Sequence, residues 1–267
     1  MLSYFKKGTQ MKSLEILKIS CCGANEFNDI NEILAFLKLN PRAEIGFGVS
    51  SQNSSQGEVR YNYISHLFQM LSENSIKNQV ALHINREWSK TVAIDGKLPE
   101  SILNLIKLAP GNIRLQVNYV GSGYGTLAKN PKKFYKLIES SGEKIRYILP
   151  FNSVNENFIM ALSKGTNKFD VLYDNSFGTG KSAENYKFLF KNQLQGYAGG
   201  LSPDNIKKEL NKINAVQKER SEIWIDAESG LRKDNLNTLD LKKAQSFLNN
   251  IYAWEKTINR QSICERF

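Results

Sequence analysis

The sequence predicts an α/β fold, a single-domain (β/α)8 barrel of parallel strands with TIM-barrel architecture. Short apolar runs rich in β-branched and aromatic residues alternate with amphipathic segments eight times along the 267 residues. This alternation is typical of parallel βαβ units. The chain length suits one such barrel, which occupies about 250 residues. No Pro- or Ser-rich linker and no internal repeat divides the sequence.

The predicted strands are runs of six to nine residues, bounded by polar or turn-forming residues. They are Leu14–Cys22, Ala43–Ser50, Val80–Asn85, Ile113–Asn118, Ile145–Asn152, Phe169–Asn175, Leu194–Gly199 and Ile223–Glu228. Near-continuous apolar strands of this kind are expected where both faces of a parallel sheet are covered.

Segments with apolar residues at helical spacing lie between these strands and after the last one. The clearest are Asp29–Lys38, Tyr63–Glu73, Pro99–Lys107, Pro131–Ser140 and Leu239–Tyr252. Their apolar residues recur every three or four positions, which predicts helices that pack one face against the barrel. We expect residues 14–267 to form the barrel and residues 1–13 to form a poorly ordered leader.

A doubly wound open sheet is the structural competitor. A dinucleotide-binding sheet would need a G-x-G-x-x-G loop after an early strand. The first strand-to-helix junction reads CCGANEFND, which does not supply that pattern. The barrel is therefore the preferred prediction.

The composition, 41% hydrophobic and 23% charged, is that of a globular protein. No apolar run approaches the roughly 18 residues of a membrane span. The net charge of +10 comes from Lys and Arg scattered along the chain without a nucleic-acid motif, so it favours an anionic small-molecule substrate over nucleic acid. Cys21, Cys22 and Cys264 form neither a disulfide framework nor a zinc spacing, which fits the cytoplasm. We expect a monomer or homodimer without metal or redox cofactor.

The stretch NSFGTGKS ends like a nucleotide-binding loop, but Asn175 occupies the position where that loop needs its first glycine. Glycine-rich turns also follow the next two predicted strands, in AGGLSPDNI and DAESG. Ser202 is expected to be the N-cap of the helix after the first of these turns, with Pro203 at its first position. Because barrels often hold a phosphate at these strand ends, we expect a phosphate site there.

The run LYDNSFGTGKS…GYAGGLSPDNI…IWIDAESGL resembles the phosphoribosylanthranilate isomerase family of tryptophan biosynthesis. Members of that family read LLD…GGTGKTFDW…LAGGL-x-P-E-N-V…VDVSSGVE at these strand ends. KISCCGAN is similar to the family's K-I-C-G-x-T, and VRYNYIS to its S-x-R-Y-I-S. The resemblance covers most of the chain in order and is strongest from Phe169 to Leu231.

The resemblance implies an Amadori rearrangement of N-(5-phosphoribosyl)anthranilate to the aminodeoxyribulose phosphate by general acid/base catalysis. It implies Asp174 as the acid that opens the ribose ring and Cys22 as the base that removes the C2′ proton. Arg60 would meet the anthranilate carboxylate. The resemblance further implies a set of residues that bind the phosphorylated substrate, most of them glycines that offer backbone N–H groups: Gly178, Gly180, Lys181, Gly199, Gly200, Ser229 and Gly230.

Several positions depart from the family pattern. The fourth strand, RLQVNYVG, lacks the family's histidine, and Glu228 replaces a serine beside the predicted phosphate site. If KIS rather than CG is aligned with the family, Ser20 stands at the base position, and a serine is a poor base. His83 lies within the third strand and can face the site. The alternatives are therefore a diverged phosphate-binding barrel with isomerase, lyase or aldolase chemistry on another substrate, or a non-catalytic ligand-binding barrel.

Overall fold

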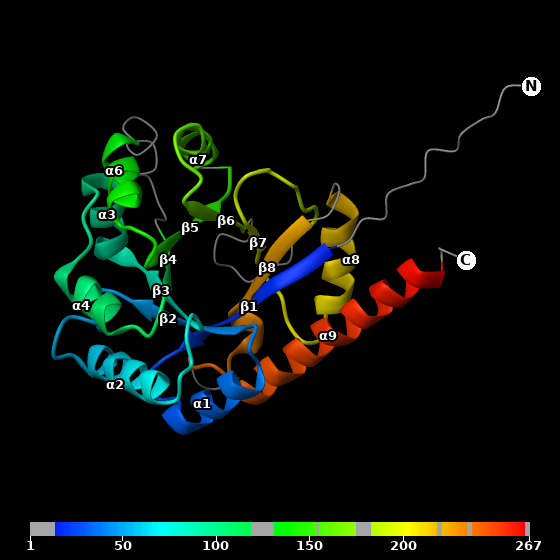
Figure 1. The fold of residues 1–267 in the computed structure, drawn as a ribbon, viewed down its shortest axis with the longest axis horizontal. Helices are drawn as coiled ribbons and strands as arrows, with labels where there is room; N and C mark the ends of the chain where they lie inside the picture. Colours follow the sequence, from blue (N-terminus) through cyan, green and yellow to red (C-terminus); the bar gives the residue numbers. More distant parts are fainter. Residues whose placement is uncertain are drawn as a thin grey trace, which may run out of the picture.

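The computed structural model confirms the barrel: eight parallel strands close in chain order, and β1 pairs with both β2 and β8. Figure 1 shows the strands surrounded by the helices. The structure describes residues 14–118, 131–153, 155–174, 183–217, 221–233 and 237–264, so the predicted leader lies outside the described residues. None of the described helices is both long enough and apolar enough to cross a membrane.

The strands follow the predicted positions closely. They are β1 (Leu14–Ala24), β2 (Ala43–Val49), β3 (Val80–Ile84), β4 (Ile113–Val117), β5 (Ile145–Phe151), β6 (Phe169–Tyr173), β7 (Gln195–Tyr197) and β8 (Ser221–Ala227). The strand β7 is shorter than predicted at both ends, and β8 begins and ends earlier than predicted. The strand β1 continues through Gly23 to Ala24, with a shift of register against β2 after Cys22. Gly23 accommodates this irregularity with a φ of 96°, which side chains disfavour.

The helices are α1 (Ile30–Leu39), α2 (Val59–Glu73), α3 (Arg86–Asp95), α4 (Glu100–Leu108), α6 (Lys132–Ser140), α7 (Glu156–Ser163), α8 (Ile206–Val216) and α9 (Leu241–Cys264), with a 3-10 turn η1 (Ser229–Leu231). The predicted C-terminal helix is longer than its apolar pattern indicates, and α9 packs against α8 and α1. The helix α3 was not among the segments singled out from the sequence. It begins immediately after β3 and positions residues of the candidate site.

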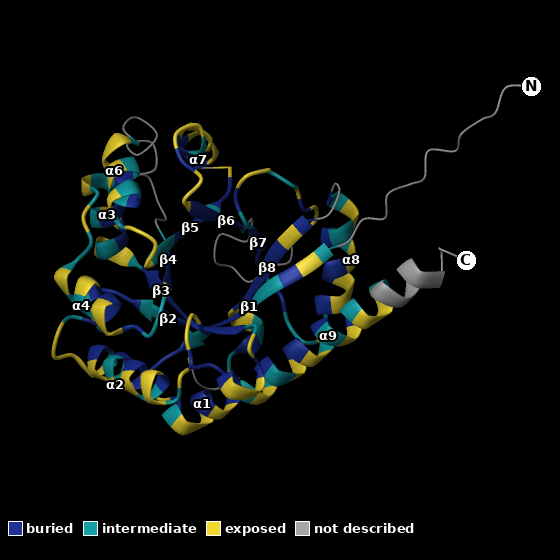
Figure 2. Ribbon diagram, in the orientation of Figure 1, coloured by how far each residue is buried: buried dark blue, intermediate teal, exposed yellow. Residues whose placement is uncertain are grey.

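The main core lies between the outer face of the barrel and the helices. In Figure 2 most of the strand residues are buried, except at the start of β1 and β8, and the helices are exposed on their outer sides. Large apolar side chains such as Phe47, Phe68, Phe134, Phe169 and Phe247 are fully buried. Each contributes about 1.5–3 kcal/mol relative to an exposed position. This layer accounts for the alternation of apolar strands and amphipathic helices in the sequence.

The interior of the barrel carries buried charges instead. Arg114 of β4 donates to Glu44 of β2 at 2.9 Å and to Asp170 of β6 at 3.1 Å. Arg146 donates to the other oxygen of Asp170 at 2.8 Å. The guanidinium of Arg114 also lies 3.9 Å from the ring of Trp224, on the opposite strand β8. This ion cluster links five strands of the barrel from within.

Replacing Arg114 with Met tests the contribution of this cluster. The change keeps most of the side-chain volume but deprives two buried carboxylates of a partner. Because an uncompensated buried charge is costly, we expect the free energy of unfolding, measured by urea denaturation, to fall by about 3–5 kcal/mol. As a control, Lys168→Met breaks a surface pair with Glu139, and we expect no measurable change. Equal effects of the two substitutions would contradict this account.

Candidate functional site

Three polar side chains meet inside the barrel, two residues further along their strands than the ion cluster. The thiol of Cys22, on β1, donates to Asp226 Oδ2 of β8 at 3.2 Å and lies 3.7 Å from His83 Nε2 of β3. All three side chains are buried. Gly46 of β2 permits this arrangement, because a Cβ at that position would lie 2.6 Å from the Cys22 sulfur and 3.0 Å from His83 Nε2.

Alternation along β1 separates the three neighbouring residues Ser20, Cys21 and Cys22. The Cys21 side chain belongs to the outer core, whereas those of Ser20 and Cys22 make contacts inside the barrel. Ser20 donates to Glu44 and is therefore part of the deeper ion cluster. Cys22 is nearer the carboxyl ends of the strands, where barrel enzymes carry their chemistry. This placement favours Cys22 over Ser20 as the candidate base.

Burial and negative neighbours keep the Cys22–Asp226 pair protonated. Burial, then the charge of Asp226, raises the pKa of the Cys22 thiol well above its usual range. Burial also raises the pKa of Asp226 to about 8, although the hydrogen bond from Cys22 opposes this shift. Burial lowers the pKa of His83, which favours a neutral imidazole. A thiolate base needs a lowered pKa, so Cys22 requires a proton acceptor, and Asp226 is in position to be one.

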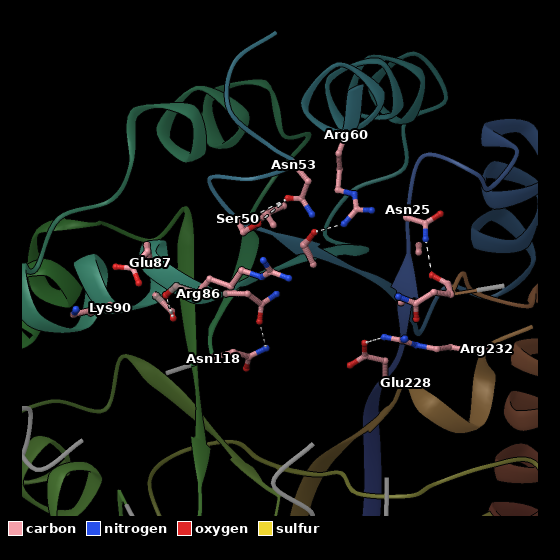
Figure 3. A pocket seen from close by; sticks show the side chains of 17 residues that line it. Asn25, Ser50, Asn53, Arg60, Arg86, Glu87, Lys90, Asn118, Glu228 and Arg232 are labelled. Atoms are coloured by element: carbon pink, nitrogen blue, oxygen red, sulfur yellow. Dashed lines mark hydrogen bonds and ion pairs between the residues drawn. The ribbon is translucent and has the colours of Figure 1, made fainter. Parts of the chain in front are cut away.

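A pocket of about 810 Å³ opens above these three residues at the carboxyl ends of the strands. Figure 3 shows the side chains that line it. The lining follows β1, β2, β3, β4 and β8, and it includes Gly48, Asn85 and Glu228, which lie two residues beyond Gly46, His83 and Asp226. The buried cluster therefore lies directly below the floor of the pocket.

Cationic side chains dominate the charged part of the lining. They are Arg60, Arg86, Lys90 and Arg232, against Glu87 and Glu228. The excess of positive charge suits an anionic ligand.

Two of these cations are engaged within the protein. Arg60 donates to Glu26 at 2.6 Å and to the Gly48 carbonyl at 2.9 Å. Burial alone would raise the pKa of Glu26, but the hydrogen bond from Arg60 lowers it overall. Arg232 donates to Glu228, the residue that departs from the family pattern. The structure thus places Arg60 in the pocket, with part of its hydrogen-bonding capacity already used.

The glycines after β7 and β8 form another part of the barrel mouth. Gly199 and Gly200 have φ values of 100° and 60°, which favour glycine. Gly230, in η1, packs so closely against the loop after β7 that a Cβ there would lie 2.3 Å from the Leu201 carbonyl. Gly230 and the neighbouring Ser229 therefore belong to a turn that packs against Leu201 and Ser202, which directly follow Gly199 and Gly200.

The remaining predicted residues belong to the loop after β6. Asp174 directly follows β6, is partly exposed, and its N–H donates to the Phe151 carbonyl. Asp174, Gly199, Gly200, Ser229 and Gly230 are not among the described residues that line the pocket. Gly178, Gly180 and Lys181 lie outside the described residues, and their predicted role stays a prediction.

The expectation for the start of the helix after β7 was wrong. The helix α8 begins at Ile206, and its N-cap is Asn205 rather than Ser202. The side chain of Asn205 accepts from the Ser202 N–H at 2.9 Å and donates to the Gly200 carbonyl at 2.8 Å. These bonds stabilise a turn in place of the first helical turn, so Pro203 precedes the helix.

Cys22, His83 and Asp226 also deserve comparison with metal sites. Their donor atoms all lie within 4.8 Å of one another. Thiolate, imidazole and carboxylate are the donor types that bind zinc. In this structure the Cys22 thiol already shares its proton with Asp226, and a metal ion would have to displace that proton. The expectation that the protein has no metal stays a prediction.

The sequence suggested that His83 could face the site, and the structure places its ring beside the Cys22 thiol. Sequence reasoning did not single out Asp226, Arg86 or Asn118. The sequence did contain a signal for Asp226, which is a carboxylate within the otherwise apolar run IWIDA. Burying a carboxylate is costly, so its presence there indicates a partner or a raised pKa. Arg86 and Asn118 follow their strands directly, but polar residues are common at such positions.

The sequence matches no family model and no curated protein. Solved structures share the fold. A phosphoribosylanthranilate isomerase from Thermotoga maritima is 13% identical, with a TM-score of 0.50 over 88% of this chain and 98% of that chain. A phosphoribosylanthranilate isomerase in complex with reduced 1-(o-carboxyphenylamino)-1-deoxyribulose 5-phosphate is 11% identical, with a TM-score of 0.50 over 89% of this chain and 100% of that chain.

A second class of enzyme is equally similar. A truncated 3-deoxy-D-arabino-heptulosonate 7-phosphate synthase from Thermotoga maritima is 10% identical, with a TM-score of 0.50 over 92% of this chain and 88% of that chain. At these identities the likeness shows the barrel fold alone. The chain is a TIM barrel whose mouth carries a cationic pocket above a buried thiol–carboxylate pair.

The raised pKa of Asp226 predicts a pH-dependent stability. Between its ordinary pKa of 3.8 and the folded-state value of about 8, the folded protein keeps a proton that the unfolded chain releases. Stability from this group is therefore lost as pH rises through this interval and is constant above it. In urea unfolding from about pH 5 to pH 9, the stability of wild type relative to Asp226→Asn should fall by up to about 1.4 kcal/mol per pH unit below pH 8.

The exposed Asp204 provides the control. Wild type compared with Asp204→Asn should show no such slope. A difference between wild type and Asp226→Asn that does not change with pH would show that Asp226 is not held protonated.

Proposed function

We propose that this chain is an isomerase of the phosphoribosylanthranilate isomerase type. It would convert N-(5-phosphoribosyl)anthranilate to the aminodeoxyribulose phosphate in an Amadori rearrangement. The observation that carries the proposal is the hydrogen-bonded Cys22–Asp226 pair directly below a cationic pocket. The sequence resemblance at the ends of β6, β7 and β8 supplies the substrate class.

The pair offers a physical route for proton abstraction by a thiol with a raised pKa. As Cys22 Sγ takes the C2′ proton of the ring-opened substrate, its own proton passes to Asp226 Oδ2, 3.2 Å away. One bond forms at sulfur as another breaks, so no isolated buried thiolate has to exist. The protonated carboxyl that results is stable near neutral pH, because burial raises the pKa of Asp226 to about 8.

Asp174 is proposed as the acid that protonates the ribose ring oxygen. It follows β6, whereas Cys22 is on β1, so the two groups can reach different atoms of one substrate. Gly199, Gly200, Ser229 and Gly230 are proposed to contact the phosphate. The acid, the base and the phosphate turns all belong to the carboxyl ends of strands in one closed barrel. The protein would act as a cytoplasmic monomer or homodimer.

A diverged barrel enzyme acting on another phosphorylated substrate is the second candidate. The presence of Glu228 in the pocket wall favours it, because a carboxylate there disfavours a nearby phosphate. Its ion pair with Arg232 reduces that repulsion. A barrel that binds a ligand without catalysis is the remaining alternative, and it predicts binding without turnover.

Turnover of phosphoribosylanthranilate tests the proposal directly. We expect its fluorescence to decay when the protein is added, and we expect the gene to restore growth without tryptophan in a strain that lacks this isomerase. Asp174→Asn and Cys22→Ala should each lower kcat by about 10²–10⁴-fold, because each removes a proton-transfer group. Ser20→Ala is the matched control on β1 and should change kcat less than threefold. Unchanged turnover in Asp174→Asn would exclude Asp174 as the acid.

The proposed base also predicts a pH–rate profile. Because only ionised Asp226 can take the thiol proton, kcat/KM should rise about tenfold per pH unit below pH 8 and level off above it. The apparent pKa belongs to the Cys22–Asp226 pair rather than to either residue. Asp226→Asn should lower the plateau and remove the rise. A flat wild-type profile between about pH 6 and pH 9 would contradict the shared-proton base.

A further inference from the structure

We propose that Arg86, with Asn85 and Asn118, forms a subsite for a carboxylate group of the ligand on the β3–β4 side of the pocket. Figure 3 shows Arg86 pointing toward the middle of the pocket, between Arg60 and Asn118. The identification of this carboxylate as that of anthranilate rests on the proposed function, whereas the carboxylate subsite itself does not.

The backbone of Arg86 is the first argument. Its φ is 57°, a left-handed conformation that costs free energy for any residue with a Cβ. The other such non-glycine residues, Ser75 and Asn78, have local explanations. Ser75 ends α2 with the bond from the Ile76 N–H to the Leu71 carbonyl, and the Asn78 side chain accepts from the Asn112 N–H at 2.6 Å.

Arg86 starts a helix rather than ending one, and the bond at its own backbone is the one that its carbonyl accepts from Ser89 Oγ at 2.7 Å. Strained backbone of this kind concentrates at ligand-binding and active sites. The strain at Arg86 therefore points to a functional reason for its position.

The hydrogen-bonding capacity of Arg86 is the second argument. Within the described part of the chain, no hydrogen bond or ion pair reaches its guanidinium, whereas Arg60 and Arg232 are paired with Glu26 and Glu228. A free guanidinium has five N–H donors in a planar fork that fits both oxygens of a carboxylate. Arg86, rather than Arg60, is thus the arginine best able to bind a new anion.

The surroundings of Arg86 are the third argument. Asn118 donates to Asn85 Oδ1 at 3.0 Å and accepts from Gln116 at 2.8 Å, so its amide is held in a fixed orientation. Asn85 is the N-cap residue of α3, but its side chain donates to the His83 carbonyl and does not cap the helix. The positive end of the α3 dipole lies beside Arg86 and favours an anion there, although Glu87 in the first turn of the same helix opposes part of this attraction.

The position of this subsite agrees with the rest of the site. Asn85 lies two residues after His83, whose ring nitrogen is 3.7 Å from the Cys22 sulfur. The glycine turns proposed for phosphate follow β7 and β8, on the other side of β1 in the closed barrel. A ligand with a phosphate at one end and a carboxylate at the other would thus extend across Cys22.

A ligand pair and four variants test this inference by calorimetric titration. The ligands are reduced 1-(o-carboxyphenylamino)-1-deoxyribulose 5-phosphate and the same compound with an unsubstituted phenyl ring. We expect wild type to bind the carboxylated compound at least tenfold more tightly. Arg86→Gln should reduce this ratio to near one without weakening the binding of the phenyl compound more than twofold. Lys90→Gln removes another charge from the same helix and should preserve the ratio, as should Arg60→Gln.

Arg86→Gly is the folding control. It removes the guanidinium and relieves the left-handed strain, so its unfolding temperature should equal or exceed that of wild type while the selectivity for the carboxylate is lost. The inference would be overturned if Arg86→Gln still bound the carboxylated compound at least tenfold more tightly than the phenyl compound. It would also be overturned if Lys90→Gln reduced this affinity ratio as much as Arg86→Gln does.

A second arm separates this inference from the proposed function. If neither sugar phosphate binds wild type, the proposed function fails, and anthranilate alone is then compared with aniline. Weak binding of anthranilate that disappears in Arg86→Gln would still support the carboxylate subsite. Absence of anthranilate binding to wild type would overturn it.

Discussion

The Arg114 guanidinium occupies the middle of the barrel, and the arrangement of the polar interior depends on it. It contacts carboxylates of β2 and β6 and stacks on the Trp224 ring of β8. Burial alone would raise the pKa of Glu44, but the charges of Arg114 and Lys18 lower it overall, so this carboxylate stays ionised inside the protein. Buried charges are tolerated only when they are paired in this way. The cluster thereby fixes the relative position of strands whose next inward residues form the candidate site.

The division of the barrel interior into two halves follows from this constraint. Ile148, Leu172, Ala198 and Trp224 form a small apolar cluster on the inward faces of β5 to β8. Gly196 lets the Trp224 ring lie flat against β7, since a Cβ there would be 2.1 Å from the ring. The polar half is formed by β8 and β1 to β4, where Cys22, His83 and Asp226 meet. Because the apolar half excludes water on one side, the Cys22–Asp226 pair is fully desolvated, and this desolvation is the main cause of both raised pKa values.

The fold could be predicted from the sequence because eight apolar strand segments recur, most of them followed by an amphipathic helix that has to bury its apolar face. The candidate site could be predicted only in part. Cys22 and Arg60 were found through short motifs, but their partners were not. Asp226 is far from Cys22 in the sequence, and Glu26 lies in a stretch without a recognisable motif. The pKa of the thiol could not be deduced either, since it depends on the carboxylate that the closed barrel brings beside it. The N-cap of α8 shows a further limit of prediction from sequence. The Asn205 side chain accepts from the Ser202 N–H, and the helix begins after Asn205 rather than after Ser202.

The charges in the pocket show why a residue that matches a motif need not carry the function expected of it. Arg60 matches the family's arginine, yet its Nε and one terminal nitrogen already donate to Glu26 and Gly48. A new anion at Arg60 would compete with a neighbouring carboxylate, and that competition weakens binding. Arg86 faces the same pocket, and no hydrogen bond or ion pair reaches its guanidinium within the described residues. A cation that is already paired inside the protein has to give up part of that interaction when it binds a new anion, whereas an unpaired cation only exchanges water for the ligand. The junction between β3 and α3 places Arg86 at the pocket, and the proposed carboxylate subsite rests on this placement rather than on the motif that contains Arg60.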